Sequence, residues 1–294
     1  MFLTVYLAAA VAALFYAIFP VIGAFVVREQ WRQFRRSVIR SAALPELSPA
    51  VLGSPCTALG RFRAQGEVDA IGGQHELWIA GHMACIVDLH DAWVYVLTGG
   101  QDDCRVERLR WRALPSVGAG TRAFVAGSAS FTGGRTVFGP SGKDSPLVIL
   151  HDGDDEDLIR RAVKHGRHGN EYWNPVTQVS LALGVAAMSG ILSLSRLGGM
   201  PSLVTALTLC AAFSPILPLL PPGVVGFFLY RWLWKRALRL RSLRDMEVLD
   251  DGWSRKARAL RAMASKATAA SAAAFVVSFA VNAWLTVFLL RRFL

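Results

Sequence analysis

Long apolar runs constrain this chain more than any other feature, because a helix that crosses a bilayer needs roughly 20 apolar residues. The sequence contains four such runs, at residues 2–27, 175–195, 202–234 and 269–290. They belong to a chain of 294 residues that is 53% hydrophobic and only 18% charged. The pattern predicts a membrane protein with four transmembrane helices and a sizeable polar portion between the first and the second.

The first run is expected to stay in the mature protein as an anchor. It opens with Met-Phe-Leu-Thr-Val-Tyr, which contains no basic side chain. A cleaved secretory signal has a basic start and a shorter apolar core. Because this run lacks both features, we expect it to be a retained transmembrane helix.

The third run differs from the others because it is rich in helix-breaking residues, namely Pro215, Pro218, Pro221, Pro222 and Gly223. A membrane helix with these residues must kink or break, and the freed main-chain carbonyls need partners inside the protein. The sequence leaves two possibilities open: a kinked crossing helix, or a first half that lies on the membrane surface.

The net charge of +11 is distributed in a way that predicts topology. Lys and Arg crowd residues 28–50, the segment before residue 175, and the loop 235–268, whereas the opposite ends of the runs carry few. Cytoplasmic flanks of membrane helices carry such an excess. We therefore expect a bacterial inner-membrane protein with both termini outside and the polar portion in the cytoplasm. Because topology accounts for the cations, no nucleic-acid partner is predicted.

Residues 58–152 have the pattern of a small β domain. From residue 60, apolar and polar side chains alternate, which is typical of a strand with one buried face. Further short strand-like segments follow, separated by glycine-rich turns such as Gly72-Gly73 and Gly133-Gly134. Such a series favours a partly closed barrel of the five-stranded OB type. The predicted fold class is therefore an α+β membrane protein with an OB-like barrel inserted between the first two spans.

Two connecting segments flank this domain. Residues 28–50 are expected to form a basic juxtamembrane helix with Trp31 on the membrane surface. Residues 153–174 are expected to form a helix capped by Asp154 that leads to the second span. At that point aromatic residues typical of the headgroup level and a helix-starting Asn-Pro pair follow one another. The predicted membrane-interface residues are Trp31, Tyr172, Trp173, Asn174, Pro175, Trp232 and Trp234.

One cluster offers metal-binding chemistry. On a strand, His82, Asp88 and His90 share one face, whereas Cys85 points to the other. Two imidazoles and a carboxylate are suitable zinc ligands, but no second ligand group with diagnostic spacing exists elsewhere. The alternative is a solvated strand face. The acidic segment 151–157 lacks the glycine and glutamate of an EF-hand, and Gly139–Asp144 lacks the magnesium-binding hydroxyl of a P-loop, so no cofactor is predicted.

The four cysteines, Cys56, Cys85, Cys104 and Cys210, contain no Cys-x-x-Cys pair. Free thiols are therefore the expectation for a domain that faces the cytoplasm.

The segment from Gly120 to Arg161 carries a resemblance to a known family. It reads Gly-Thr-Arg-Ala-Phe-Val-Ala-Gly-Ser-Ala-Ser-Phe-Thr-Gly-Gly, then a turn, then Pro-Leu-Val-Ile-Leu and a helix that opens with Asp-Asp-Glu-Asp-Leu-Ile-Arg-Arg. It resembles the beside-a-membrane, or GIDE-type, domain of mitochondrial membrane ubiquitin ligases and their prokaryotic relatives. The resemblance implies a β-rich domain between two membrane helices. No Cys/His-rich RING follows the second span, so ubiquitin ligation is not implied.

These observations favour a non-enzymatic scaffold or membrane-associated regulator that presents a cytoplasmic interaction module. The expected partners are the lipid bilayer and another membrane or cytoplasmic protein, with homo-oligomers also possible through small residues of the spans. The alternative is a membrane-embedded enzyme or a lipid-handling protein that uses the face of His82, Asp88 and His90.

Overall fold

The computed structural model of the chain divides into two compact units, Met1–Gln30 with His168–Leu294, and Trp31–Arg167. The two units are described separately. The structure describes residues 2–48, 58–72, 75–81, 84–90, 92–100, 104–114, 117, 120–132, 135–141, 145–196, 201–221 and 223–293.

A five-stranded ring closes the sheet of the second unit. Strands β1 (Ala58–Gly72), β2 (Glu76–Gly81), β3 (Cys85–Asp88), β7 (Arg135–Gly139) and β6 (Arg122–Thr132) neighbour one another in this order, and β6 pairs back onto β1. The long antiparallel register from Ala58↔Ser130 to Glu67↔Arg122 makes this closure. The ring confirms the β-barrel that the alternating sequence predicted.

Three further strands extend the sheet beyond the ring. Strand β8 (Leu147–His151) pairs with β6, then β4 (Trp93–Thr98) pairs with β8, and β5 (Arg105–Arg110) pairs with β4. The β4–β8 pair is parallel, with Val94 opposite Val148 and Leu97 opposite His151. Strand β8 and its neighbour therefore need cover on both faces.

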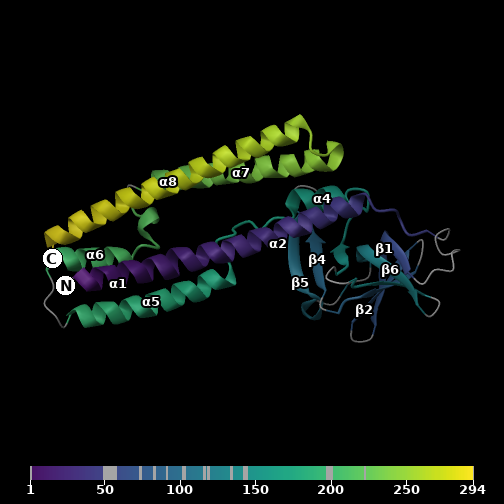
Figure 1. Cartoon of the computed structure of the whole chain (residues 1–294), viewed down its shortest axis with the longest axis horizontal. Coiled ribbons are helices and arrows are strands. Elements are labelled where there is room, and N and C mark those ends of the chain that lie inside the picture. The colour runs from purple at the N-terminus through teal and green to yellow at the C-terminus, as the bar shows by residue number, and fades with distance from the viewer. Residues whose placement is uncertain are drawn as a thin grey trace. The chain divides into compact units, whose positions relative to one another are not determined.

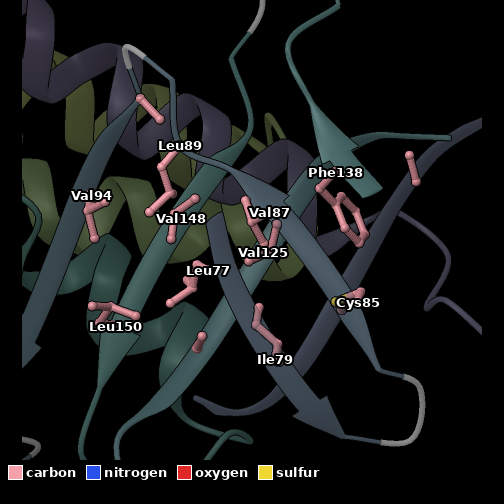
Figure 2. Packing of buried hydrophobic residues seen from close by; sticks show 14 of the residues in the cluster. Leu77, Ile79, Cys85, Val87, Leu89, Val94, Val125, Phe138, Val148 and Leu150 are labelled. Atoms are coloured by element: carbon pink, nitrogen blue, oxygen red, sulfur yellow. The ribbon is translucent and has the colours of Figure 1, made fainter. Parts of the chain in front are cut away.

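One face of the sheet encloses the core of the barrel. Figure 2 shows the side chains of Leu77, Val87, Val125, Phe138 and Val148 converging between the strands. Each is 1% exposed or less. Their immediate neighbours along each strand point to the opposite face, as the pleat of a strand requires.

Helix α2 (Phe19–Ala42) packs on the other face of β4, and helix α4 (Leu158–His165) contacts β5. The Phe34 ring stacks on Tyr95 of β4 at a centroid distance of 4.0 Å, and Trp31 meets the edges of both rings. Arg35 donates a hydrogen bond of 2.8 Å to the carbonyl of Gly166. Trp31 is only 8% exposed. This position corrects the expectation that Trp31 lies on the membrane surface, because the strongly apolar sheet face competes for the same side chain.

Helix α4 begins at Leu158 instead of following an Asp154 cap, and its N-cap residue Asp157 makes no side-chain capping bond. Asp155 accepts two hydrogen bonds from Arg122. Asp155, which was expected in the first turn of the helix, is instead engaged by an arginine of β6.

Three helices are long and apolar enough to cross a membrane: Leu3–Ala42, Pro175–Ser193 and Arg255–Phe293. The first is continuous through α1 (Phe2–Ala12), the π-helical turn η1 (Ala13–Ile18) and α2. It packs on α5 (Pro175–Arg196), where Ser180 donates a hydrogen bond to the carbonyl of Phe15. Ser180 and Gly184 are four residues apart, a spacing that lets helices approach closely.

The third apolar run forms two helices with a break between them. Helix α6 (Ser202–Ala212) is followed by the 3₁₀ turn η3 (Leu217–Leu219) and then by α7 (Val224–Asp251). The prolines explain the break, because each removes a main-chain donor. Asn282 donates hydrogen bonds to the carbonyls of Leu217 and Leu220 and accepts one of 3.2 Å from the N–H of Gly223.

Asn282 belongs to α8 (Arg255–Phe293), which runs antiparallel to α7. Figure 1 shows the two helices side by side along their length. Ser278 bonds the carbonyl of Gly223 at 2.7 Å, and near the turn Lys256 pairs with Glu247 at 2.6 Å. The segment 235–268, expected as a basic loop, is therefore a helical hairpin with its turn at Gly252. Small residues and ion pairs such as that of Lys256 with Glu247 keep α7 and α8 in contact beyond their apolar portions.

Candidate functional site

A polar cavity of about 420 Å³ lies on the outer face of the barrel. Its lining comes from β2, β3, β7 and the adjoining turns, and consists of His75, Glu76, Ile86, Asp88, His90 and Val137. Glu76 and Asp88 are direct register partners on β2 and β3. Because their neighbours Leu77 and Val87 point into the core, both carboxylates point outward. Strand register therefore places two acids side by side at this surface.

Two imidazoles complete one side of the cavity. The rings of His75 and His90 meet edge to face at a centroid distance of 4.9 Å, and His75 meets Trp111 at the same distance. The main-chain N–H of His90 donates a 2.8 Å hydrogen bond to Asp88. Among the described residues, buried Nδ1 of His75 has no hydrogen-bond partner. The cavity thus offers two carboxylates, two imidazoles and an apolar floor.

The predicted metal site of His82, Asp88 and His90 stays a prediction. Asp88 and His90 line the same cavity, whereas His82 lies outside the described residues. In the ranges that the structure describes, no group of three or more His, Cys, Asp or Glu side chains is placed to hold a metal ion. Sequence reasoning missed His75 and Glu76, although the hairpin turn at Gly72-Gly73 was recognised. The β2–β3 register was the missing information.

Cys85 does not line this cavity, and its thiol has low reactivity. Its side chain points into the barrel core and is 2% exposed. Burial raises the pKa of the Cys85 thiol to about 11. The thiolate is the reactive form of cysteine, so Cys85 in this position is a poor nucleophile at neutral pH.

We expect Cys85 in the folded, full-length protein in mild detergent to resist a maleimide at pH 8. At a pKa of about 11 only on the order of one thiol in a thousand is ionised at that pH, and burial also blocks access. Labelling followed by mass spectrometry checks this, with a Thr98→Cys variant as the exposed control. Equal labelling rates at positions 85 and 98 would contradict the buried location.

A second titratable cluster lies where β8 ends. The side chain of His151 is fully buried and its Nε2 lies 3.3 Å from a carboxylate oxygen of Asp155. Asp155 also pairs with Arg122, and the nearby Arg161 donates a hydrogen bond to the carbonyl of Gly99. Burial lowers the pKa of His151 below its usual range, Asp155 opposes this shift, and Arg161 and Arg122 reinforce it.

We expect His151 to make the protein less stable in mild acid. Because its folded-state pKa lies below the unfolded value of about 6.5, the unfolded chain binds the extra proton, and the free energy of unfolding falls as the pH drops below about 6.5. One such proton gives a slope of at most about 1.4 kcal/mol per pH unit. Urea titrations between pH 7 and 5, followed by tryptophan fluorescence, measure it. The slope should become smaller in His151→Leu; an unchanged slope would assign the effect to other groups.

The predicted interface residues before the second span form a capped helix start. Asn174 accepts a 3.1 Å hydrogen bond from the N–H of Thr177, and Pro175 is the first residue of α5. This arrangement confirms the helix start predicted from the Asn-Pro pair. The side chain of Asn174 also lies against Gly23, where a Cβ atom would come within 2.4 Å of its Oδ1.

The aromatic residues of this region fall into two groups. Tyr172, Trp173 and Trp232 are exposed, as interface residues are. Trp234 instead lies near two guanidinium groups, those of Arg28 at 5.8 Å and Arg241 at 5.6 Å from its ring centroid. Arg28 also pairs with Glu171 at 2.7 Å. Glu171 therefore makes a specific contact that a simple helix start does not require.

The described residues define a protein with a closed five-stranded β-barrel and apolar helices long enough to cross a membrane. No family model matches this chain, and no curated protein or solved structure is similar to it. The function is therefore argued from the geometry of the chain itself.

Proposed function

We propose that this protein is a polytopic membrane protein whose β domain is a cytoplasmic interaction module. The observation that carries the proposal is the polar cavity on the outer face of a barrel that already has a complete apolar core. Glu76 and Asp88 lie outside that apolar core. Outward-facing acids and imidazoles are suited to contacts with another molecule.

The proposed topology has four spans. The third is discontinuous: α6 and the apolar start of α7 together provide 22 helical residues, on either side of the break that Asn282 bridges. Neither half alone is long enough to cross. The excess of Lys and Arg around residues 28–50 and 235–268 supports a cytoplasmic β domain in a bacterial inner membrane, with both termini outside.

The resemblance to the beside-a-membrane domain supports only the placement of a β domain between two membrane helices, since the two further spans and the cytoplasmic side are departures from that family. In that family a β-rich domain stands between two membrane helices, and here the barrel is encoded between the apolar helices that begin at Leu3 and Pro175. The OB-like character of the five-stranded ring and membership of that family are both part of the proposal. The role we propose is that of a scaffold or membrane-associated regulator.

Photo-crosslinking in cells tests the module. A photoreactive amino acid is placed at position 76, at position 88, or at the exposed control position 67 on β1. We expect one adduct of the same mass from positions 76 and 88, lost when Asp88→Lys is added to the position-76 variant, and none from position 67. Equal adduct yields at positions 67 and 76 would reject a specific contact at the cavity.

A labelling test of the proposed topology requires engineered cysteines, because Cys85, Cys104 and Cys210 are buried. In a cysteine-free background, Asp69→Cys in the β domain and Phe293→Cys near the C-terminus provide exposed reporters. A membrane-impermeant maleimide should label position 293 in intact cells and position 69 only after permeabilisation. Labelling of position 69 in intact cells would place the barrel outside.

The alternative function is a membrane-embedded enzyme or lipid-handling protein. It is favoured by the paired imidazoles of His75 and His90, since imidazole is the commonest general acid or base at neutral pH. Alanine at His82, Asp88 and His90 separates the two functions. A folded variant that loses bound metal or a catalytic phenotype would support the enzyme, whereas loss of the crosslinked partner alone would support the module.

A further inference from the structure

Strand β5 is the open end of the sheet. The barrel ring closes on itself through β1 and β6, but in the strand order β5 has only β4 as a neighbour. Within the part of the chain that the structure describes, the main chain of Arg105–Arg110 pairs with no segment other than β4. Every second residue of β5 therefore presents its N–H and C=O groups outward, as an edge strand does.

Natural edges are usually blocked against further pairing. The common devices are a proline, a bulge, a charged side chain that crosses the edge, or a helix or loop that covers it. Helix α4 contacts β5, but in the described ranges it makes no main-chain hydrogen bond to the strand. Strand β5 contains no proline, and its register with β4 is continuous from Arg105↔Thr98 to Arg110↔Trp93. The first two devices are therefore missing.

Two arginines of β5 are held away from the edge. The guanidinium groups of Arg108 and Arg110 lie over the Trp93 ring of β4, at 3.7 and 5.1 Å from its centroid. Because Trp93 is on the inner neighbour of β5, these two side chains fold back over the sheet. The stacking also holds two positive charges in place next to an open ladder.

The positive charge of this edge favours an acidic partner. Residues 105–112 contain four arginines and a single acid, Glu107. Arg108 and Arg110 are two positions apart and share a face of the strand. A strand added beside β5 places alternate side chains on that face, so acids at positions i and i+2 meet the two guanidinium groups.

We propose that β5 receives an extended acidic segment of a partner protein as an additional strand. Main-chain hydrogen bonds to the open ladder hold the segment, and carboxylates at alternate positions pair with Arg108 and Arg110. The surface is distinct from the outer-face cavity. The inference rests on the proposed function in treating the β domain as an interaction module, and it adds the surface and the chemistry of the partner.

Peptide binding to the full-length protein in detergent micelles tests this inference. The probe is a fluorescein-labelled seven-residue peptide in which Glu alternates with Val or Thr, and anisotropy reports binding. A second probe carries Lys at the Glu positions. Two further probes keep the charges but are N-methylated at alternate amides, one probe for each set of amides, so that main-chain donors are removed without a change of charge.

We expect the Glu peptide to bind and the Lys peptide not to bind. One of the two N-methylated peptides should bind roughly tenfold more weakly, since only one set of amides faces β5. Arg110→Glu should weaken the Glu peptide by at least about tenfold through charge reversal. Arg110→Gln avoids an additional acid on the strand and should give a smaller loss of affinity for the Glu peptide. This variant replaces Arg110→Glu in the test if Arg110→Glu does not fold.

The matched control is Arg135→Glu, because Arg135 also lies over a tryptophan, Trp78, at 4.7 Å, but on β7. This variant should bind the Glu peptide within about twofold of the unmodified protein, since a distant surface charge is screened. Equal losses in Arg110→Glu and Arg135→Glu would overturn the inference in favour of unspecific charge attraction. Full binding by both N-methylated peptides would overturn strand addition.

A failure of the peptides and a failure of the proposed function are distinguishable. If no peptide binds while positions 76 and 88 still crosslink to a partner, the edge inference falls and the interaction module stands. If the unlabelled protein itself competes with the peptide and associates as its concentration rises, the occupant is a second copy of this chain and the acidic-partner inference falls.

Discussion

Replacing Phe34 by alanine is expected to lower the free energy of unfolding of the β domain by about 3–5 kcal/mol. The Phe34 side chain is 2% exposed and stacks on Tyr95. Alanine removes the ring contact and leaves a cavity between α2 and the sheet. Urea denaturation of the full-length protein in mild detergent, followed by far-ultraviolet circular dichroism or hydrogen exchange in β4 and β8, measures the loss.

The control for Phe34 lies on the same helix. Gln33 is exposed, so Gln33→Ala should change stability by no more than about 0.5 kcal/mol. Equal small effects at positions 33 and 34 would mean that this part of α2 lies on a free surface, as the sequence predicted for Trp31. A large difference would establish that the basic segment is part of the folded domain.

Replacing Asn282 by leucine is expected to destabilise the helical unit by about 2–4 kcal/mol, because three main-chain groups at the break lose their partner in an apolar setting. Those groups are the carbonyls of Leu217 and Leu220 and the N–H of Gly223. Leucine has a similarly branched but larger side chain and cannot form hydrogen bonds. Unfolding in mixed micelles with an increasing fraction of dodecyl sulfate, followed by helicity, measures the change.

Two other residues of α8 provide comparisons for the destabilisation caused by Asn282→Leu. Ser278→Ala removes the single hydrogen bond to the carbonyl of Gly223 and should cost about 1 kcal/mol. Val281→Ala, at a side chain that is 40% exposed, should cost less than Asn282→Leu. If Asn282→Leu is as stable as Val281→Ala, the break does not depend on α8 for its hydrogen bonds.

Local patterns predicted much of this fold because their physical cause is local. Alternation over residues 60–70 is enough to specify a strand, and β1 covers it from Ala58 to Gly72. The Asn174–Pro175 pair specified a helix start for the same reason. The apolar run 85–97 favours a single strand by its sequence, but it divides into β3 and β4 at a turn where the N–H of Ala92 bonds the carbonyl of Leu89.

Long-range pairing was the part that the sequence did not specify. The closure of β1 onto β6 joins residues more than 50 positions apart, and the parallel β4–β8 pair depends on cover from α2. The burial of Trp31 follows from that cover. For the same reason the sequence predicted only part of the cavity lining. Asp88 and His90 were recognised along one strand, whereas His75 and Glu76 reach them only across the β2–β3 ladder.

The length of α8 has a mechanical consequence. Its 39 residues form a rod of about 58 Å, whereas the hydrocarbon core of a bilayer is only about 30 Å thick. In a membrane, a large part of the rod must stand clear of the lipid, braced by α7 through Arg241 and Thr268 and through Glu247 and Lys256. The tip, where Trp253 is 60% exposed, is then held at a fixed height above the headgroups. If α8 spans the membrane as proposed, the hairpin would hold a molecule bound at its tip at a set distance from the membrane.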